Sequence, residues 1–287
     1  MPEYSTPEPI DLAVNLQVGA LDIIASDRPD TVVTVAPTNP GKAVDRRGAE
    51  ETKVEFDGRR LTVTGPKPRL SWIGPTESVD LRIELPAGSR LTAEIAVGAV
   101  RSTGRLGATR IKASMGPVEL EATGDLWLRA GHGNASVDTI AGGAEITADH
   151  GQLRIGALAG DALLKASHGS IQLGETGGEV EAKLSYGDLE ITRALGSVTA
   201  KTAYGSIQLR EVSSGSVQLE SGFGQVTVGI RPGVPAWLDL SSKEGHVRNE
   251  LDGDTAAPAP TEETVAVRAR TQYGDITVRR APARAQL

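Results

Sequence analysis

The chain has no cysteine, and aromatic residues make up only 3% of its 287 residues. Without cysteine it can form no disulfide, no thiolate nucleophile and no cysteine-based zinc site. General nucleic-acid binding needs clustered basic and aromatic side chains, and a chain with a net charge of −7 and few aromatics is not expected to provide them. Nowhere do about 18 apolar residues run together, and Met1 to Pro9 lack the apolar run of an export signal. We therefore expect no membrane insertion and a cytoplasmic location.

Glycine is abundant, with 34 residues, and it recurs at a nearly fixed interval. Apolar residues stand two and four positions after most members of one series, with polar residues between them, and this alternation predicts a strand with one buried face. A second series runs half a period out of step and also opens strands. The first series is Gly98, Gly116, Gly133, Gly151, Gly169, Gly187, Gly205 and Gly224; the second is Gly107, Gly124, Gly142, Gly160, Gly178, Gly196 and Gly215.

Each repeat of about 18 residues therefore holds two strands and two tight turns, which leaves no room for a crossover helix. Coils of this kind stack on one another by parallel pairing. The sequence thus predicts an all-β fold, a single-domain parallel β-solenoid with capping strands at both ends. Glycine is expected at the corners because they need a positive φ or a close approach of backbones.

The pattern also predicts how the chain is divided. Phe56 to Leu61, with Asp-Gly at its centre, is expected to form a hairpin inside the N-terminal cap. The basic end of the last strand is expected to protect a sheet edge. The predicted parts are a flexible N-terminus at residues 1–9, a β cap continuous with the solenoid at 10–95, regular repeats at 96–250, a mobile loop rich in proline, alanine and acidic residues at 251–263, a final strand at 264–280 and a flexible tail at 281–287.

Two features together resemble a known family. The stretch from Val79 to Leu91, VDLRIELPAGSRL, precedes repeats such as Tyr186 to Ile191, YGDLEI. The LPAGS entry combined with many such repeats resembles the bacterial β-strand-repeat proteins labelled "putative adhesin", or toast-rack domains, from about residue 10 to residue 280. The resemblance implies a β-solenoid with no established enzymatic activity and no catalytic residues to carry over.

Side chains one period apart are expected to stack in columns. The column just before the first glycine series includes three of the four histidines, His132, His150 and His168. Imidazoles about 5 Å apart could share a metal ion, or act as a pH sensor by repelling one another when protonated below about pH 6.5. The alternative, which we favour, is a structural ladder of planar side chains, because the column is Met115, His132, His150, His168, Tyr186, Tyr204 and Phe223.

A second column, three residues earlier, is mostly basic. Its members are Lys112, Arg129, Thr147, Lys165, Lys183, Lys201 and Glu220. The five basic residues could form an anion-binding stripe. A solvated face is the interpretation that we favour, since the whole chain is acidic and no aromatic residues interleave for base stacking.

Trp72 and Ile73 lie between proline and glycine residues in a segment that is expected to be a surface loop. Tryptophan is enriched at binding hot spots, so this loop is a candidate for contact with a partner. It could equally cover the end of the solenoid. Trp127 and Trp237 lie in predicted strands and are expected to be packing residues.

The sequence therefore predicts a protein that is not an enzyme and needs no cofactor. We favour a scaffold or protein-interaction module, with self-association through incompletely capped coils as one form of it. The alternative is a metal, anion or glycan binder, or a polysaccharide-acting enzyme, that uses the histidine and basic columns.

Overall fold

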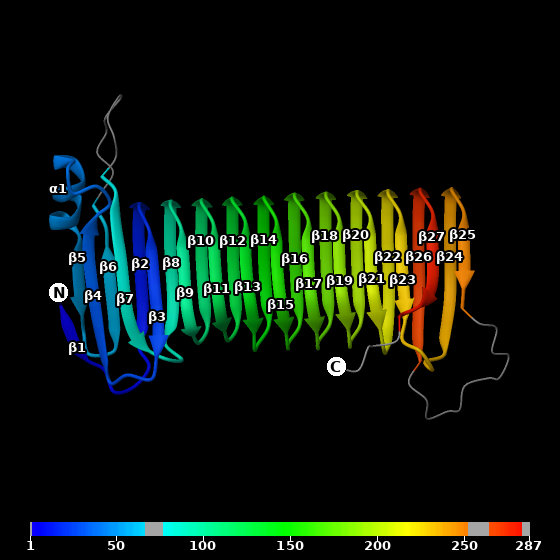
Figure 1. The fold of residues 1–287 in the computed structure, drawn as a ribbon, viewed down its shortest axis with the longest axis horizontal. Helices are drawn as coiled ribbons and strands as arrows, with labels where there is room; N and C mark the ends of the chain where they lie inside the picture. Colours follow the sequence, from blue (N-terminus) through cyan, green and yellow to red (C-terminus); the bar gives the residue numbers. More distant parts are fainter. Residues whose placement is uncertain (1, 67–76, 252–263, 283–287) are drawn as a thin grey trace. The chain divides into compact units, whose positions relative to one another are not determined.

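The computed structural model describes residues 2–66, 77–251 and 264–282, and the chain divides into two compact units, residues 1–142 and 143–287. In both units, strands that pair mostly in parallel form two sheets (Figure 1). Each regular coil gives one strand to each sheet, and partners in neighbouring strands, such as Ala162 and Val180, are 18 residues apart. The predicted all-β parallel solenoid with two-strand coils is confirmed.

The first unit begins with irregular, partly antiparallel strands and continues as regular coils. One of its sheets has the order β1-β4-β7-β3-β9-β11-β13 and the other β5-β6-β2-β8-β10-β12. The elements are β1 (Glu3–Ser5), β2 (Asp11–Val18), β3 (Leu21–Ser26), β4 (Asp30–Pro37), α1 (Ala43–Glu51), β5 (Lys53–Phe56), β6 (Arg60–Thr64), β7 (Val79–Pro86), β8 (Arg90–Val97), β9 (Val100–Arg105), β10 (Thr109–Met115), β11 (Val118–Thr123), β12 (Leu126–His132) and β13 (Ala135–Ile140).

The second unit is built from parallel strands throughout. Its sheets have the orders β14-β16-β18-β20-β22-β26-β24 and β15-β17-β19-β21-β23-β27-β25. The elements are β14 (Ala144–His150), β15 (Leu153–Leu158), β16 (Ala162–His168), β17 (Ile171–Thr176), β18 (Val180–Tyr186), β19 (Leu189–Ala194), β20 (Val198–Tyr204), β21 (Ile207–Val212), β22 (Gly215–Phe223), β23 (Val226–Ile230), β24 (Ala236–Glu244), β25 (Val247–Glu250), β26 (Val265–Tyr273) and β27 (Ile276–Arg280).

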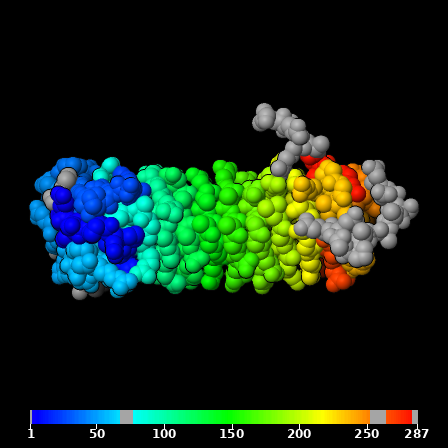
Figure 2. Space-filling view, turned by 90° about the horizontal axis from the view of Figure 1, so that it is seen from below, coloured from blue at the N-terminus to red at the C-terminus, as the bar shows by residue number. Residues whose placement is uncertain are grey.

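Alternate side chains of each coil fill a narrow core between the two sheets. Leu164, Ile171 and Val180 are fully buried, and so are small residues such as Ala182 and Ala200. The intervening side chains point outward, and Figure 2 shows the successive coils of each unit packed directly against one another. The core is therefore thin and aliphatic, as the low aromatic content requires.

Glycine at the corner between the two strands of a coil is needed for two reasons. Gly187 has a φ of +144°, which other residues rarely adopt. A Cβ atom added there would also lie 2.0 Å from the carbonyl oxygen of Gly169, the corner glycine of the preceding coil. The corners thus stack with backbone against backbone, and this close approach explains why the first glycine series keeps the coil period.

Helix α1 was not predicted from the sequence. Its residues, AVDRRGAEE, are mostly charged and show no apolar stripe. Tertiary contacts hold it instead: the buried carboxylate of Asp45 accepts hydrogen bonds from the backbone N–H groups of Asn39 and Ser78, both at 3.2 Å. Gly48 lies so close to Glu77 that a Cβ atom would be 2.7 Å from the Cβ of that residue. Neither interaction leaves a periodic signal in the sequence.

The N-terminal segment is more ordered than expected at residues 3–5. These residues form β1, which pairs antiparallel with β4, although residues 1–9 were predicted to be flexible. Thr6 and Thr31, both buried, share a hydrogen bond of 2.8 Å that holds the end of β1 against β4. The hairpin predicted between Phe56 and Leu61 is confirmed as the antiparallel pair β5 and β6.

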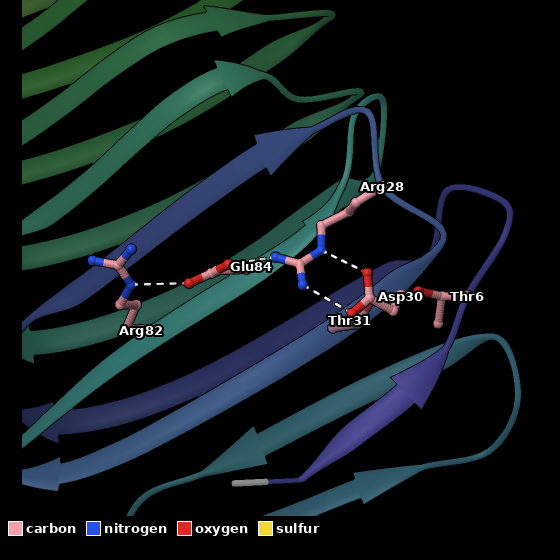
Figure 3. A network of polar contacts seen from close by, with 6 residues as sticks. All are labelled: Thr6, Arg28, Asp30, Thr31, Arg82 and Glu84. Atoms are coloured by element: carbon pink, nitrogen blue, oxygen red, sulfur yellow. Dashed lines mark hydrogen bonds and ion pairs between the residues drawn. The ribbon is translucent and has the colours of Figure 1, made fainter.

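Arg28 joins the turn between β3 and β4 to β7 (Figure 3). Its guanidinium donates two hydrogen bonds of 2.9 Å to Asp30 and one of 2.5 Å to Glu84, which also accepts a bond of 3.2 Å from Arg82. These charged hydrogen bonds from Arg28 lower the pKa of the Asp30 and Glu84 carboxyls. The network thus fastens the turn to the neighbouring strand by charge.

The C-terminal strands lie in a different order from the one predicted. The segment expected to be one final strand at a sheet edge forms two strands, β26 and β27, and these lie between β22 and β24 and between β23 and β25. The prediction that the basic end of the last strand protects an edge is therefore wrong. β26 and β27 come after β24 and β25 in the chain but lie inside them in the sheets. The wider spacing of Gly224, Gly245 and Gly274 accompanies this change of order, which the spacing alone could not predict. The segment predicted to be a mobile loop lies outside the described residues except for Leu251, and so does the predicted tail from residue 283.

We expect Gly187→Ala to lower the free energy of unfolding by about 3 kcal/mol or more. The φ strain alone costs about 1–3 kcal/mol, and the clash with the carbonyl of Gly169 adds to it. Gly233 is the matched control, because it has a φ of +81° but no atom lies within 4 Å of the position that a Cβ would take. Gly233→Ala should cost only about 1 kcal/mol. Equal losses in urea unfolding would contradict a role for the close approach.

The Arg28 network predicts a pH-dependent contribution to stability. Both carboxyl pKa values are lowered in the folded state, so the stabilisation is present above the ordinary values of 3.8 and 4.5 and is lost as the pH falls below them. Arg28→Met should therefore destabilise the chain at pH 7, and its difference from the native chain should shrink below about pH 4. Arg154→Met is the control, since Arg154 bonds neutral Gln172 and its effect should not vary with pH. Denaturant unfolding at several pH values measures both.

Candidate functional site

In the second unit, six residues that each precede a corner glycine form one continuous ladder of stacked rings, whereas Glu244 precedes the corner glycine Gly245. Neighbouring ring centroids are 4.7 to 5.1 Å apart and neighbouring planes are within 8° of parallel. The spacing is that of the strands themselves, because each ring sits on the next strand of the sheet. The members of this ladder, the ring ladder, are His150, His168, Tyr186, Tyr204, Phe223 and Tyr273.

The ring ladder is half exposed. Tyr186 is 50% exposed and Tyr204, Phe223 and Tyr273 between 44% and 46%. Because the ring faces cover one another, the edges of the rings are what solvent reaches. No sugar or base can enter between neighbouring rings, so the ladder is not suited to the stacking by which open aromatic faces bind such ligands.

Two of the three predicted histidines lie side by side within the second unit. His150 and His168 are register partners in β14 and β16, with ring centroids 4.9 Å apart. His132 is the register partner of Met115 in the first unit. Among residues 2–66, 77–251 and 264–282, no three His, Cys, Asp or Glu side chains are grouped so that they could hold a metal ion. The metal hypothesis stays a prediction without structural support.

The predicted anion stripe is placed on the outer faces of the sheets, and much of its charge is paired. Lys112 contacts Glu94 at 2.5 Å in the first unit, where Arg129 is its neighbour. In the second unit Lys183 contacts Glu181 at 2.6 Å and lowers the pKa of that carboxyl, and Lys201 contacts Glu220 at 2.9 Å. Lys165 adjoins Lys183 in the register. The stripe is thus a row of ion pairs more than a run of free cations, and its anion binding stays a prediction.

A groove of about 680 Å³ lies on the outer face of β20, β22, β26 and β24. The small residues Ala203 and Gly222 lie along it, between the rings of Tyr204 and Phe223 and the charged side chains. Those charged side chains are Lys201, Glu220, Lys243 and Arg270.

Sequence reasoning missed Arg270 of this groove and Tyr273 of the ring ladder. Arg270 and Tyr273 belong to β26, which enters the sheet between β22 and β24, so they continue the basic column and the ring ladder without keeping the 18-residue period. Their signal was the recurrence of the alternating pattern before Gly274. Trp237, expected to be a packing residue, is 58% exposed on β24. Trp127 lies under the guanidinium of Arg110, 3.7 Å from its ring centre.

Trp72 and Ile73, the predicted partner loop, lie outside the described residues. In the part of the chain that the structure describes, no helix is long and apolar enough to cross a membrane. The predicted cytoplasmic location stays a prediction.

Removing one ring from the middle of the ring ladder is expected to destabilise the second unit. Tyr204→Ala breaks two stacked pairs, each worth about 0.5–1.5 kcal/mol beyond its buried area, so we expect a loss of about 1–3 kcal/mol. Tyr204→Phe keeps the ring and should stay within about 0.5 kcal/mol of the native chain. Thermal and denaturant unfolding of the two variants measure this. A loss of the same size for phenylalanine would mean that the hydroxyl, and not the stacking, matters.

The match to a family model supports the resemblance seen in the sequence. The chain is similar to a "putative cell adhesion protein" from Clostridium sporogenes, with 11% identity and a TM-score of 0.24 over 97% of this chain and 99% of that one. It is also similar to a "putative adhesin" from Bacteroides fragilis, with 12% identity and a TM-score of 0.38 over 96% and 95% of the two chains. No curated protein matches. The model of the family described as Toastrack DUF4097 matches residues 20–233, and the chain therefore belongs to the Toastrack DUF4097 family.

Proposed function

We propose that this chain is a non-enzymatic scaffold that binds a protein partner through the outer face of the sheet β14-β16-β18-β20-β22-β26-β24. The ring ladder is the observation that carries this proposal. It places four large aromatic side chains, each 44% to 50% exposed, in one row beside paired charges. Tyrosine and phenylalanine are enriched at protein interfaces, where their rings pack against the partner. The hydroxyl group of tyrosine can also form a hydrogen bond with the partner.

The ladder also suits binding because it is already rigid. Inner rings such as Tyr186 and Tyr204 lie between two others, so little side-chain freedom remains to be lost on association. The small residues Ala203 and Gly222 lie between the ring row and the charged row, where they leave room for the side chains of a partner. The adjacent ion pairs of Lys183 with Glu181 and Lys201 with Glu220 would form a polar rim.

A second candidate function is the binding of an anionic ligand in the groove. It is favoured by Lys201, Lys243 and Arg270, three cations that line the groove together with one acid, Glu220. Asp239, 3.7 Å from Arg270, offsets part of this charge. This candidate requires binding that weakens steeply as salt is raised, whereas the ring ladder predicts a contact that survives moderate salt.

Site-specific photo-crosslinking tests the partner-binding face. A benzophenone-bearing phenylalanine at position 186 replaces one ring of the ladder by another and leaves its edge reactive toward a bound partner. The control carries the same group at Gln208, which lies on β21 in the other sheet of the same unit. In a lysate of cells that naturally make the protein, adjusted to moderate salt, we expect one defined adduct from position 186 and none from position 208.

Either of two outcomes would reject the proposed face: adducts of equal yield from both positions, or no adduct from position 186. An adduct that disappears with moderate salt and with Lys201→Glu would instead favour the anionic ligand.

A further inference from the structure

Among the described residues, both sheets of the second unit end in a strand that is paired on one side only. The order of one sheet closes with β24 and that of the other with β25, which are the two strands of a single coil. Each pairs with only one neighbour, β26 or β27. A parallel strand with a neighbour on one side only leaves half of its N–H and C=O groups without a ladder partner, which makes both strands templates for further pairing.

The same coil leaves its core side chains incompletely covered. Val247 is 44% exposed, and Leu238 and Leu240 are half-buried. One strand further in, their register partners Ile276 and Val267 are fully buried. We call the residues Leu238, Leu240 and Val247, with the outer edges of β24 and β25, the terminal coil surface. It is an apolar core that stops without a cover among the described residues.

At the N-terminal end of the first unit, by contrast, the sheet edges are protected. The last strands there are β1 and β5, which are short and antiparallel to their neighbours. Tyr4 of β1 and Phe56 of β5 meet across the two sheets with ring centroids 4.8 Å apart, and α1 contacts β4 and β7. Short edge strands and a covering helix are among the ways in which native proteins protect sheet edges. β25 is as short as β5, but β24 has nine residues, and no helix contacts either strand in the part of the chain that the structure describes.

We propose that the terminal coil surface is the interface of a symmetric dimer, in which it meets the same surface of a second copy of this chain. A two-fold axis that brings this end against its copy must lie across the direction in which the coils stack. It therefore reverses the stacking direction and turns every edge strand antiparallel to the strand that it meets. Antiparallel pairing satisfies the open N–H and C=O groups of both sheets at once.

The charges on these two strands suit such a reversal. Outward residues of β24 include Asp239 and Lys243, and those of β25 include Arg248 and Glu250. In an antiparallel self-pairing, a residue early in a strand faces one late in the partner strand. Asp239 can then lie opposite the partner's Lys243, and Arg248 opposite the partner's Glu250. In each strand, the two charges of opposite sign are therefore placed so that each faces its opposite in the second copy.

By composition, residues 252–263 are less suited to covering the terminal coil surface than a second copy is. Residues 252–263, DGDTAAPAPTEE, include four acidic residues and two prolines, and no apolar side chain larger than proline. Proline cannot donate to a strand ladder, and alanine is too small to fill the space over leucine and valine. A second copy supplies the leucines and the valine of its own terminal coil surface, which match those that they would cover.

Sedimentation velocity on the native full chain, from low micromolar to near-millimolar concentration, tests this dimer. We expect the mass to rise from 29.9 kDa to twice that value and to stop there, because a two-fold interface uses up the open end. Val247→Lys and Leu240→Lys should each weaken dimerisation by about tenfold or more, since each buries an unpaired charge at the interface. Met115→Lys, on a residue that is 53% exposed in the first unit, should leave it unchanged.

The native chain gives a result that does not depend on the folding of any variant. A native chain that stays monomeric over the whole range overturns the proposal, and so does growth into filaments. A dimer that survives both lysine variants, with thermal unfolding showing that they fold, also overturns it. The proposal does not depend on the partner-binding face, because the ring-ladder crosslinks and the dimer mass are read independently.

Discussion

The contact of one corner glycine with the next is the constraint on which the rest of the structure depends. The space beside Gly187 is filled by the carbonyl oxygen of Gly169, and the backbone N–H of Gly187 donates to the carbonyl of Tyr204 in the following coil at 2.8 Å. Coils of other lengths keep this stack: Gly133 follows Gly116 by 17 residues and Gly224 follows Gly205 by 19, yet a Cβ added at either would lie within 2.2 Å of the earlier glycine's carbonyl oxygen. The backbone therefore fixes how the corners stack, and small differences in coil length are taken up elsewhere in the coil.

Once the period is fixed, side chains in equivalent positions must form columns. A column can hold any residue type that tolerates a like neighbour at the strand spacing, and the ring ladder shows this, because histidine, tyrosine and phenylalanine occupy equivalent positions with nearly parallel planes. Charges cannot do so without compensation. Lys183 and Lys201 are register neighbours, and each has an acidic partner within 3 Å. The outer face is therefore set by the fold as much as by any ligand.

These rules explain which features the sequence could predict. The coils, the hairpin at Phe56 to Leu61 and the stacking of His150 on His168 follow from local alternation and a constant interval. Helix α1 and the insertion of β26 between β22 and β24 depend on contacts between distant residues, such as Asp45 with Ser78 and Gly215 with Val265, which no interval encodes. Only part of the candidate groove could be predicted, for the same reason. Lys201 follows the 18-residue interval of the coils, whereas Arg270 does not.

The insertion of β26 and β27 also decides where the molecule can bind. The chain forms β24 and β25 first and returns inside them, so the C-terminal strands lie between two neighbours and β24 and β25 form the open coil. The regular coils from residue 98 to residue 224 are joined by tight turns that build no cleft, so binding by these coils must use either an outer face or an end. The faces are covered by paired charges and by rings that shield one another, whereas the terminal coil leaves both backbone groups and core side chains without a cover among the described residues. The physical drive toward association is therefore strongest at that end, and selectivity for a different protein is best supplied by the face.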